Sequence, residues 1–295
     1  MTDRFPISDV TFTQVSSIPV VADPVYSGEN MKVSATEFAM RVPGTGSFYT
    51  QEGRVVEYET EPGADPEWIK LYLKMQVLVA LLHQRGVISF HASSFVSDGQ
   101  AVMILGESGA GKSSLTASFV LDGAGFLTDD VTPVMFRSEA PYVMPVYDAI
   151  RLREHSVDQL KIEAEFLTRA EPGSGKHYMQ VRNTARENFP LSHIFKIEVG
   201  RRRAPSFFVP APADAFGILR SEVCSWEILR GMPSTEAAYM HQLLEIMRRV
   251  KIVRVVRPVT IKISELREEI SNYLNKEKRQ SASVKATADK ERKKE

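Results

Sequence analysis

The chain has 295 residues, of which 43% are hydrophobic, and its 37 basic residues balance 37 acidic ones. A chain of this size and apolar content can bury a core without disulfides or metals, as one large domain or two small ones. Residues 276–295 contain eight basic and four acidic residues, so residues 1–275 have a net charge of −4. A nucleic-acid-binding domain would instead be expected to be basic. Cys224 stands alone, which fits a reducing compartment, and Met1–Pro6 lack the features of a secretory signal, so we expect a cytoplasmic protein.

Residues 1–60 are predicted to form a small N-terminal β region packed on the rest of the chain. After two short β-like runs, three strand-like runs follow at residues 37–42, 47–50 and 54–59, separated by turn residues. This pattern predicts a small antiparallel meander and contains no functional motif.

A core helix is predicted over residues 66–85. Asp65 precedes Pro66 in the way that an N-cap precedes the first helical position, and apolar residues recur at helical spacing until Gly86. The uncharged run extends only from Met75 to Gln84, which is too short to cross a bilayer. We therefore expect no membrane anchor here.

The next strands are predicted to form a hairpin. Residues 87–96 read as one strand, Asp98-Gly99 is the signal of a tight two-residue turn, and residues 100–105 read as a buried strand. His91 lies on the first of these strands and could point toward the segment that follows the second. A lone strand histidine is also often a structural residue, and spacing alone leaves both readings open.

Gly106 to Ser114 reads Gly-Glu-Ser-Gly-Ala-Gly-Lys-Ser-Ser, which matches the phosphate-binding pattern G-x-x-x-x-G-K-[ST]. A strand precedes it and a helix over residues 113–121 follows, so backbone N–H groups and the helix N-terminus can surround a phosphate. Lys112 would reach the β- and γ-phosphates and Ser113 would hold Mg²⁺. The predicted nucleotide-binding residues are Gly106, Glu107, Ser108, Gly109, Ala110, Gly111, Lys112, Ser113 and Ser114. The alternative is a glycine turn that binds no nucleotide.

Two adjacent carboxylates, Asp129 and Asp130, lie on a predicted strand over residues 126–135, directly after the helix that follows the loop. Near a γ-phosphate, one acid can hold Mg²⁺ and the other can accept a proton from an attacking hydroxyl. An Asp at its ordinary pKa of about 3.9 is a weak base that takes the proton late. The alternative is a pair of turn or capping aspartates.

Arg151 and Arg153 end an extended run and would share one face of a strand, where they could bind phosphate oxygens or lie on the surface. Residues 171–183 are polar and Gly-rich, as expected of a mobile loop that closes over a substrate or of a plain surface loop. Its candidate side chains are Lys176, His177 and Arg182.

The C-terminal third alternates strands and helices. A strand over residues 191–199 and a short return at 206–209 are predicted to form a hairpin whose solvated tip is Arg201–Arg203. The other predicted elements are helices over 214–229 and 235–250, strands over 251–256 and 259–263, and a last helix from Ser264 that fades near Asn275. Residues 276–295 lack apolar periodicity and are predicted to be a disordered basic tail.

The order of these motifs resembles the catalytic domain of HPr kinase/phosphorylase. The resemblance rests on Phe90-His-Ala, the Asp-Gly hairpin, the loop, and Phe-Leu-Thr-Asp-Asp-Val one helix later. More closely, the chain looks like the HPr-kinase-related proteins of bacterial biosynthetic clusters, some of which phosphorylate a serine of a ribosomally made peptide such as a lasso-peptide precursor. The resemblance is specific over residues 81–135 and looser to about 275. Residues 1–60 do not look like the N-terminal domain of true HPr kinases.

The resemblance implies an α/β fold of the HPr kinase C-terminal-domain type, a P-loop fold with a bent mixed β-sheet flanked by helices, over residues 61–275. The small N-terminal antiparallel β region would be added to it. It also implies that Asp129 is the general base, that Asp130 organises metal and phosphate, and that His91 lies beside the nucleotide phosphates with Lys112. ATP and Mg²⁺ would be the donor and the metal, with Ser113 and Asp130 as metal ligands.

These observations predict an ATP-dependent kinase that moves the γ-phosphoryl group to a hydroxyl, most simply a serine of a peptide or protein such as a ribosomally made precursor. Two alternatives stay open: a nucleotide-binding accessory or sensor module without transfer activity, and a small-molecule kinase. The expected partner is the acceptor, with no nucleic acid and no membrane. The sequence leaves the oligomeric state open, a homo-oligomer included.

Overall fold

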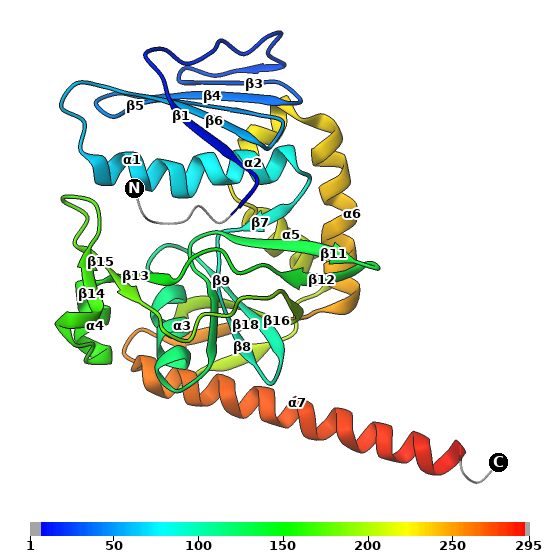
Figure 1. The fold of residues 1–295 in the computed structure, drawn as a ribbon. Helices are drawn as coiled ribbons and strands as arrows, with labels where there is room; N and C mark the ends of the chain where they lie inside the picture. Colours follow the sequence, from blue (N-terminus) through cyan, green and yellow to red (C-terminus); the bar gives the residue numbers. More distant parts are fainter. Residues whose placement is uncertain (1–6, 293–295) are drawn as a thin grey trace.

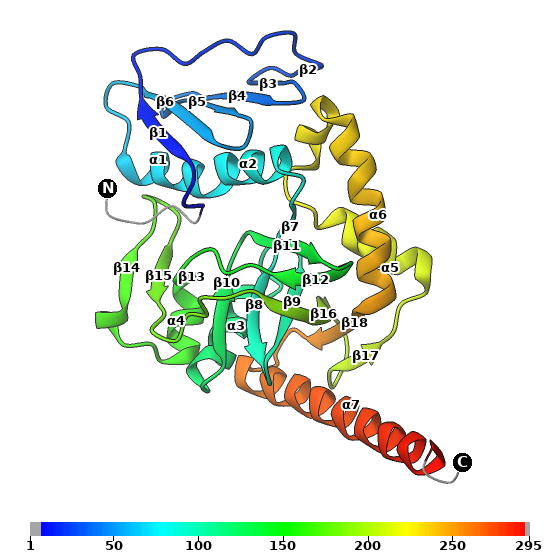
Figure 2. The ribbon, with the colours of Figure 1, turned by 45° about the vertical axis from the view of Figure 1, so that its right-hand side comes forward.

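The computed structural model describes residues 7–292, with side chains described up to Gln280. The N-terminal stretch Met1–Pro6 and the last three residues of the predicted tail, 293–295, lie outside the described residues. An N-terminal sheet lies over a long helix, a larger sheet follows beneath that helix, and the C-terminal helix runs along the opposite end of the molecule (Figure 1; Figure 2).

The N-terminal sheet has six strands in the order β1-β6-β5-β4-β3-β2. The strands are β1 (Thr11–Gln14), β2 (Tyr26–Ser27), β3 (Met31–Val33), β4 (Glu37–Val42), β5 (Gly46–Gln51) and β6 (Val55–Thr60). The predicted meander is confirmed as β4, β5 and β6. The expectation that the region is purely antiparallel is wrong in one detail, because β1 crosses over to pair with β6 in parallel.

The predicted helix after this sheet is confirmed, with a π-helical turn in its middle. It consists of α1 (Pro66–Tyr72), the π-turn η1 (Leu73–Val77) and α2 (Leu78–Gln84). Asp65 caps it, since its carboxylate accepts a hydrogen bond of 2.8 Å from the backbone N–H of Glu67. One face of the helix is buried against the N-terminal sheet and another against the larger sheet, so this helix joins the two layers.

The larger sheet has nine strands and mixes parallel and antiparallel pairs. Seven follow the order β10-β8-β9-β16-β12-β11-β7, and β18 and β17 are added beside β16. The strands are β7 (Ile88–Phe90), β8 (Ser93–Ser97), β9 (Gln100–Gly106), β10 (Gly125–Thr128), β11 (Thr132–Arg137), β12 (Ala140–Val143), β16 (Phe189–Gly200), β17 (Ser206–Phe208) and β18 (Lys251–Pro258). The Asp98-Gly99 hairpin between β8 and β9 is confirmed, with φ of 50° and 72° at its two turn residues.

Strand β16 causes the sheet to bend. Along one edge it pairs in parallel with β9, while its other edge pairs with β12 at Phe189 and Pro190 and with β18 from His193 onward. Two different strands therefore continue from one edge of β16, and the sheet divides there. The prediction of a mixed α/β fold with a bent mixed sheet and flanking helices is confirmed at this coarse level.

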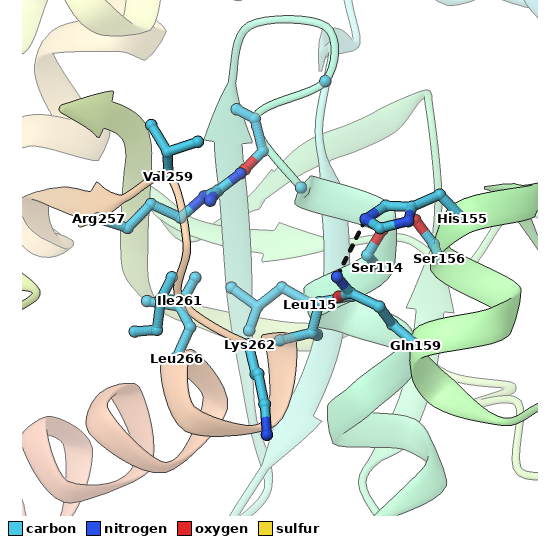
Figure 3. Close-up of a pocket in the computed structure, with 14 residues that line it drawn as sticks. Ser114, Leu115, His155, Ser156, Gln159, Arg257, Val259, Ile261, Lys262 and Leu266 are labelled. Carbon is cyan, nitrogen blue, oxygen red and sulfur yellow. Dashed lines mark hydrogen bonds between the residues drawn. The ribbon is translucent and has the colours of Figure 1, made fainter.

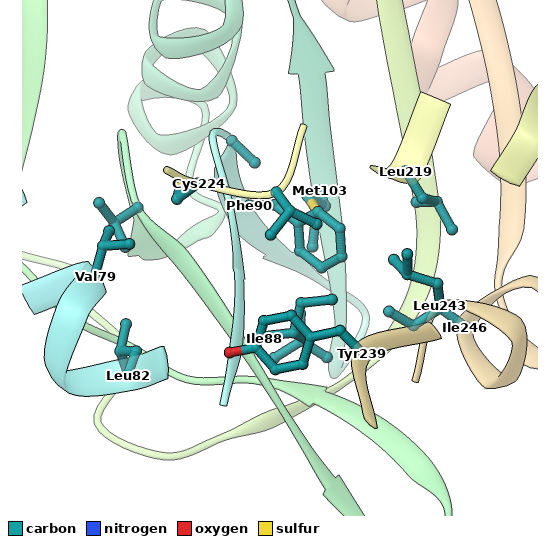
Figure 4. Packing of buried hydrophobic residues seen from close by; sticks show 14 of the residues in the cluster. Val79, Leu82, Ile88, Phe90, Met103, Leu219, Cys224, Tyr239, Leu243 and Ile246 are labelled. Carbon is teal, nitrogen blue, oxygen red and sulfur yellow. The ribbon is translucent and has the colours of Figure 1, made fainter. Parts of the chain in front are cut away.

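Strand β9 is buried on both faces. Met103 and Leu105 belong to a large core with α2 and α6 (Figure 4). Val102 and Ile104 belong to a second core with α3 and α7. Side chains alternate across a strand, so an unbroken apolar run is the expected signature of burial on both sides. The flanking helices are α3 (Lys112–Leu121), α5 (Pro212–Ser221), η3 (Trp226–Gly231), α6 (Pro233–Arg249) and α7 (Ile263–Arg292).

A third, three-stranded sheet packs beside α3. Its antiparallel order is β13-β15-β14, with β13 (Ala149–Arg153), β14 (Leu167–Arg169) and β15 (Lys176–Gln180), and it carries α4 (Glu154–Leu160) and η2 (Ala164–Phe166). The prediction of one loop over residues 171–183 is therefore wrong. Lys176 and His177 belong to β15, whose alternate residues bury Met179 against Ile150, and only residues 170–175 form a turn between β14 and β15.

Two neighbouring strands are interrupted at the same level, which the sequence did not reveal. The predicted strand over 87–96 is split into β7 and β8 around His91, and the predicted strand over 126–135 is split into β10 and β11 around Asp129 and Asp130. β10 pairs with β8, whereas β11 pairs with β7. The two interruptions therefore face each other and open one corner of the sheet.

Three further expectations for the C-terminal third are wrong. β17 pairs with β18 and not with β16, so Arg201–Arg203 is an exposed connection and not a hairpin tip. Residues 259–262 form no strand, because β16 ends at Gly200 and offers no partner beyond Pro258. Helix α7 continues to Arg292 instead of fading near Asn275, since the Lys, Glu, Arg and Ala residues there favour a helix even without an apolar face.

No helix within residues 7–292 combines the length and the apolar character that crossing a membrane requires.

A buried histidine connects α2 to the rest of the core. The ring of His83 lies between the hydroxyl of Tyr239 and the backbone carbonyl of Cys224, with both contacts at 3.0 Å. Burial lowers the pKa of His83 from 6.5 to about 4. The ring is therefore neutral in the folded protein at pH 7.

This shift predicts a pH-dependent stability. Between pH 6.5 and 4 the unfolded chain binds a proton at His83 that the folded chain does not, so stability falls by about 3 kcal/mol as the pH drops through that window. Urea unfolding of the wild type and of His83→Gln at pH 7.5, 6, 5 and 4 measures it. The difference in unfolding free energy between the two proteins should shrink toward acid pH; a constant difference would contradict a neutral buried ring.

Candidate active site

The predicted loop, Gly106–Ser114, connects β9 to α3 at the end of the bent sheet. Gly106 has φ of 155°, and a Cβ there would lie 2.7 Å from the carbonyl oxygen of Ile197 on β16. Gly111 has φ of 106° and is the N-cap of α3. Both positions require glycine, because one approaches a neighbouring strand and the other turns the backbone into the helix. The N–H groups of the first turn of α3, from Lys112 to Ser114, are thus part of the loop itself.

Lys112 folds back over the loop. Its ammonium donates a hydrogen bond of 2.6 Å to the carbonyl of Gly106, and its side chain is buried. Burial lowers the pKa of Lys112, while the charges of Glu222, Asp130 and Asp129 oppose that effect. These three carboxylates therefore surround the ammonium closely enough to stabilise its charge.

Asp129 and Asp130 form the turn that interrupts the sheet. Asp130 has φ of 65°, a left-handed conformation that aspartate tolerates better than most residues. Asp129 is only 4% exposed, and its Oδ2 accepts a hydrogen bond of 2.9 Å from the backbone N–H of Arg151 on β13. Its Oδ1 is buried and has no partner at full hydrogen-bond geometry, although the hydroxyl groups of Ser93 and Ser113 lie close enough to the carboxylate to affect its pKa.

The environment of Asp129 makes it a stronger base than an ordinary aspartate. Burial, followed by the charge of Asp130, raises the pKa of Asp129 from 3.8 to about 7, although the N–H of Arg151 and the hydroxyl groups of Ser93 and Ser113 act in the opposite direction. The expectation of a base at its ordinary pKa is therefore wrong. A carboxylate with a pKa near 7 has its two protonation states equally populated at neutral pH.

Arg151 ties the acid pair to the three-stranded sheet. Its guanidinium is bonded to the buried carboxylate of Glu171 and lies 3.9 Å from Oδ2 of Asp130. Lys176 lies near Arg151 and Asp130. Burial and then the charge of Arg151 lower the pKa of Lys176, whereas the charge of Asp130 raises it. Two cations therefore stand beside the acid pair.

His91 occupies the facing interruption between β7 and β8. Its backbone N–H donates a hydrogen bond of 2.7 Å to the backbone carbonyl of Glu222. Burial and then the charge of Lys112 lower the pKa of His91, against the charges of Asp130 and Glu222. The imidazole is thus a neutral group that lies close to both Lys112 and Asp130.

Sequence reasoning missed one ion pair of the site, Lys196 and Glu222. Both side chains are buried and bonded to each other, and both influence the pKa of Lys112. Lys196 lies on β16 in register with Leu105, next to the start of the loop. The available signal was a lysine at an inward position of an apolar strand, since an isolated buried lysine is rare unless it is paired.

The structure brings together five predicted residues, namely His91, Lys112, Ser113, Asp129 and Asp130. Arg151 and Lys176 join this group. Arg182 does not, because its guanidinium lies over the ring of Phe166, 5.0 Å from its centre. The loop residues Glu107, Ser108 and Gly109 are exposed at the tip, and Ser114 donates a hydrogen bond of 2.7 Å to the hydroxyl of Ser156, away from the acid pair.

One pocket flanks the loop, and a larger one lies at the acid pair. The smaller, of about 130 Å³, lies beside Gly111, Ser114 and Leu115 and is closed by Arg257 and by α4 (Figure 3). Arg257 donates a hydrogen bond of 3.0 Å to the carbonyl of Ala110, so it fixes the loop from this side. The larger pocket, of about 310 Å³, contains Asp129 and Asp130 in its wall.

The residues of the site fit a magnesium ion better than a transition metal. Within residues 7–292, no group of three or more His, Cys, Asp and Glu side chains could hold a metal ion by itself. Mg²⁺ needs only one or two carboxylates, because phosphates and water complete its octahedron. The carboxylate of Asp130 and the hydroxyl of Ser113 are oxygen donors of that kind, and both lie beside Asp129.

No family model and no curated protein matches the chain. Among solved structures, the chain is similar to the HPr(Ser) kinase/phosphatase from Coxiella burnetii, with 12% identity and a TM-score of 0.35. The match covers 64% of this chain and 98% of that one. A likeness this distant assigns neither a family nor an activity to the chain, and the predicted relation to the kinases of biosynthetic clusters stays a prediction.

The contact between Gly106 and β16 predicts the effect of one methyl group. Gly106→Ala should lower the free energy of unfolding by about 1 to 3 kcal/mol, because the Cβ would collide with a backbone oxygen at an unfavourable φ. Gly217→Ala is the matched control: Gly217 lies in α5 with open space around it, so the change should be neutral or slightly stabilising. Urea unfolding measures both, and equal stability of the two variants would contradict the contact.

Proposed function

We propose that the chain is an ATP-dependent kinase that transfers the γ-phosphoryl group to a hydroxyl, most simply a serine of a peptide or protein. One observation carries the proposal: a phosphate-binding loop and its Lys112 lie beside a buried carboxylate, Asp129, whose pKa is raised to about 7. A phosphate cradle alone binds nucleotide, whereas a cradle with a base beside it can activate an acceptor.

The donor is bound by the loop. Backbone N–H groups at the start of α3 and the ammonium of Lys112 bind the β- and γ-phosphates. The smaller pocket, of about 130 Å³, can take only part of the nucleoside, with Val259 and Ile261 as an apolar wall and Arg257 as a polar edge. Ser113 and Asp130 would hold Mg²⁺, which when bound neutralises charge on the phosphoryl oxygens.

The remaining side chains handle the proton and the charge. The acceptor hydroxyl oxygen forms a bond to the γ-phosphorus, the bond from that phosphorus to the bridging oxygen breaks, and ADP leaves with the electron pair. Asp129 accepts the hydroxyl proton. The neutral imidazole of His91 can donate a hydrogen bond to a phosphoryl oxygen, and Arg151 offsets the charge of Asp130.

Two variants separate binding from transfer. Asp129→Asn should keep nucleotide binding and slow phosphoryl transfer by about 100-fold or more, because it removes the base and leaves the loop intact. Lys112→Ala should weaken ATP binding as well. Asp158→Asn, on the exposed face of α4, is the matched control and should change neither. Binding is followed by calorimetry and transfer with γ-³²P-ATP and serine peptides; full transfer by Asp129→Asn would remove Asp129 from the mechanism.

The raised pKa of Asp129 also predicts a pH profile. Below pH 7 the carboxyl group is increasingly protonated and cannot accept a proton, so kcat/KM should fall about tenfold for each pH unit below that value and level off above it. The profile is measured with γ-³²P-ATP between pH 5.5 and 8.5. A rate that stays constant from pH 5.5 to 7.5 would contradict the assignment.

An accessory module that binds nucleotide and leaves the chemistry to another protein is the competing function. Measurable ATP binding without labelled product from any peptide or small hydroxyl compound would favour it.

A further inference from the structure

Lys176 is a cation beside the acid pair whose charge has no partner. In the part of the chain that the structure describes, its ammonium forms no ion pair and no hydrogen bond. Arg151, the other cation, is already bonded to Glu171. The side chain of Lys176 is nevertheless partly buried. Withdrawing a charge from water is unfavourable unless an opposite charge compensates, so this position indicates that an anion enters the site.

Lys176 projects from the open face of the three-stranded sheet, which lies beside α3 (Figure 1). Side chains alternate along β15, so Lys176, Tyr178 and Gln180 share one face, and the last two line the larger pocket. The opposite face carries Met179, which is buried with Ala117 of α3. The ammonium therefore lies on the side of the sheet that faces the acid pair and not on the side that packs against α3.

The end of this face that carries Lys176 is the end nearest to the phosphate-binding loop. Lys176 pairs with Arg153 of β13, and α4 begins directly after Arg153. Ser156 of α4 accepts a hydrogen bond of 2.7 Å from the hydroxyl of Ser114 in the first turn of α3. The acid pair is bound two residues earlier on β13, at the backbone N–H of Arg151. Lys176 therefore lies between the acid pair and the first turn of α3.

Two lysines from separate elements approach the acid pair, Lys112 from α3 and Lys176 from β15. Burial lowers the pKa of both ammonium groups, and the charges of Asp129 and Asp130 raise both. Each ammonium is thus close enough to the two carboxylates to be affected by them. An anion bound beside the acid pair would be reached from two directions.

The backbone at Lys176 is fixed by the turn that precedes it. The hydroxyl of Ser174 donates a hydrogen bond of 2.8 Å to the carbonyl of Glu171 and accepts one of 3.3 Å from the backbone N–H of Lys176. The carboxylate of Glu171 in turn holds the guanidinium of Arg151. One turn therefore positions both cations. Charged groups that are positioned in advance stabilise a developing charge without a cost of reorganisation.

From these contacts we infer that Lys176 is a second phosphoryl-binding cation, which binds the γ-phosphoryl group from the side of the three-stranded sheet while Lys112 binds it from the loop. The inference rests on the proposed kinase function and adds a catalytic residue to it.

The charge of Lys176 acts on the transfer without a proton moving to or from it. The acceptor oxygen forms its bond to the γ-phosphorus as the bond from that phosphorus to the bridging oxygen breaks. The electron pair leaves with ADP, and Asp129 takes the hydroxyl proton. Lys176 stays protonated throughout, and its charge offsets negative charge on the oxygens of the group in transfer.

Fluoroaluminate tests the inference without an acceptor peptide. With MgADP, this planar anion takes the place of the phosphoryl group in transfer, and water takes the place of the hydroxyl. Calorimetry compares the binding of MgADP with and without fluoroaluminate. The wild type should bind MgADP about tenfold more tightly, or better, when fluoroaluminate is present, because an analogue of the transition state contacts both lysines. Equal binding under the two conditions would contradict the inference.

Three variants show whether Lys176 causes this gain. Lys176→Gln should reduce it to about twofold or less, Lys176→Arg should retain most of it because the charge remains, and Lys32→Gln, at an exposed lysine of β3, should leave it unchanged. MgADP alone should bind equally to all four proteins, since ADP lacks the γ-phosphoryl group. A full gain in Lys176→Gln would overturn the inference.

Transfer from γ-³²P-ATP to serine peptides gives a second measurement. Lys176→Gln should lower kcat by about 100-fold or more and change the KM for ATP by about threefold or less, because the lost interaction is made mainly in the transition state. A purely structural role would instead weaken MgADP binding as well.

Failure of the proposed function would give a different result. If fluoroaluminate binds through Lys176 but no acceptor is labelled, Lys176 is a phosphoryl-binding residue and the kinase assignment is wrong. If the wild type and Lys176→Gln label the same peptides equally fast, the kinase assignment holds and the inferred role of Lys176 is wrong.

Discussion

The burial of two adjacent carboxylates is the constraint on which the rest of the site depends. Charged groups lose hydration when they are buried, so the Asp129–Asp130 pair persists only with compensation from its surroundings. The N–H of Arg151, the guanidinium of the same residue and the ammonium of Lys112 supply it. The compensation is incomplete, because the pKa of Asp129 stays near 7. The remaining imbalance raises the proton affinity of this carboxylate above that of an ordinary aspartate.

The sheet makes room for the pair by interrupting two neighbouring strands at one level. β7 and β11 pair on one side of the interruption, and β8 and β10 pair on the other. His91 and the acid pair therefore meet without either strand leaving the sheet. β16 pairs with β9, so the loop Gly106–Ser114 lies at the same corner, where Lys196 and Glu222 are bonded to each other near Lys112. One irregular corner thus holds groups from five separate segments of the chain.

Structural elements that depend on neighbouring residues were predicted from local sequence patterns. The other features of the site depend on contacts between segments that are distant in sequence. The strand, glycine turn and helix around Gly106–Ser114, the Asp98-Gly99 hairpin and the helix capped by Asp65 follow from short motifs, and the structure contains all three. The interruptions of the predicted strands over 87–96 and 126–135 could not be predicted. A continuous apolar run does not show that its first and second halves pair with different strands. The Lys196–Glu222 pair and the cation–π contacts of Lys74 join segments that are distant in sequence. The basic C-terminal segment has no apolar periodicity and is nevertheless helical. A missing apolar face therefore argues against packing onto a core, but not against helix formation.

The central claim is that burial beside Asp130 gives Asp129 a pKa near neutrality. NMR of protein labelled with ¹³C at the aspartate carboxyl carbons measures this directly, with Asp129→Asn used to assign the resonance. The account predicts that the assigned signal titrates with a midpoint near pH 7 in the nucleotide-free protein. A midpoint below about pH 5, close to that of an ordinary aspartate, would contradict it.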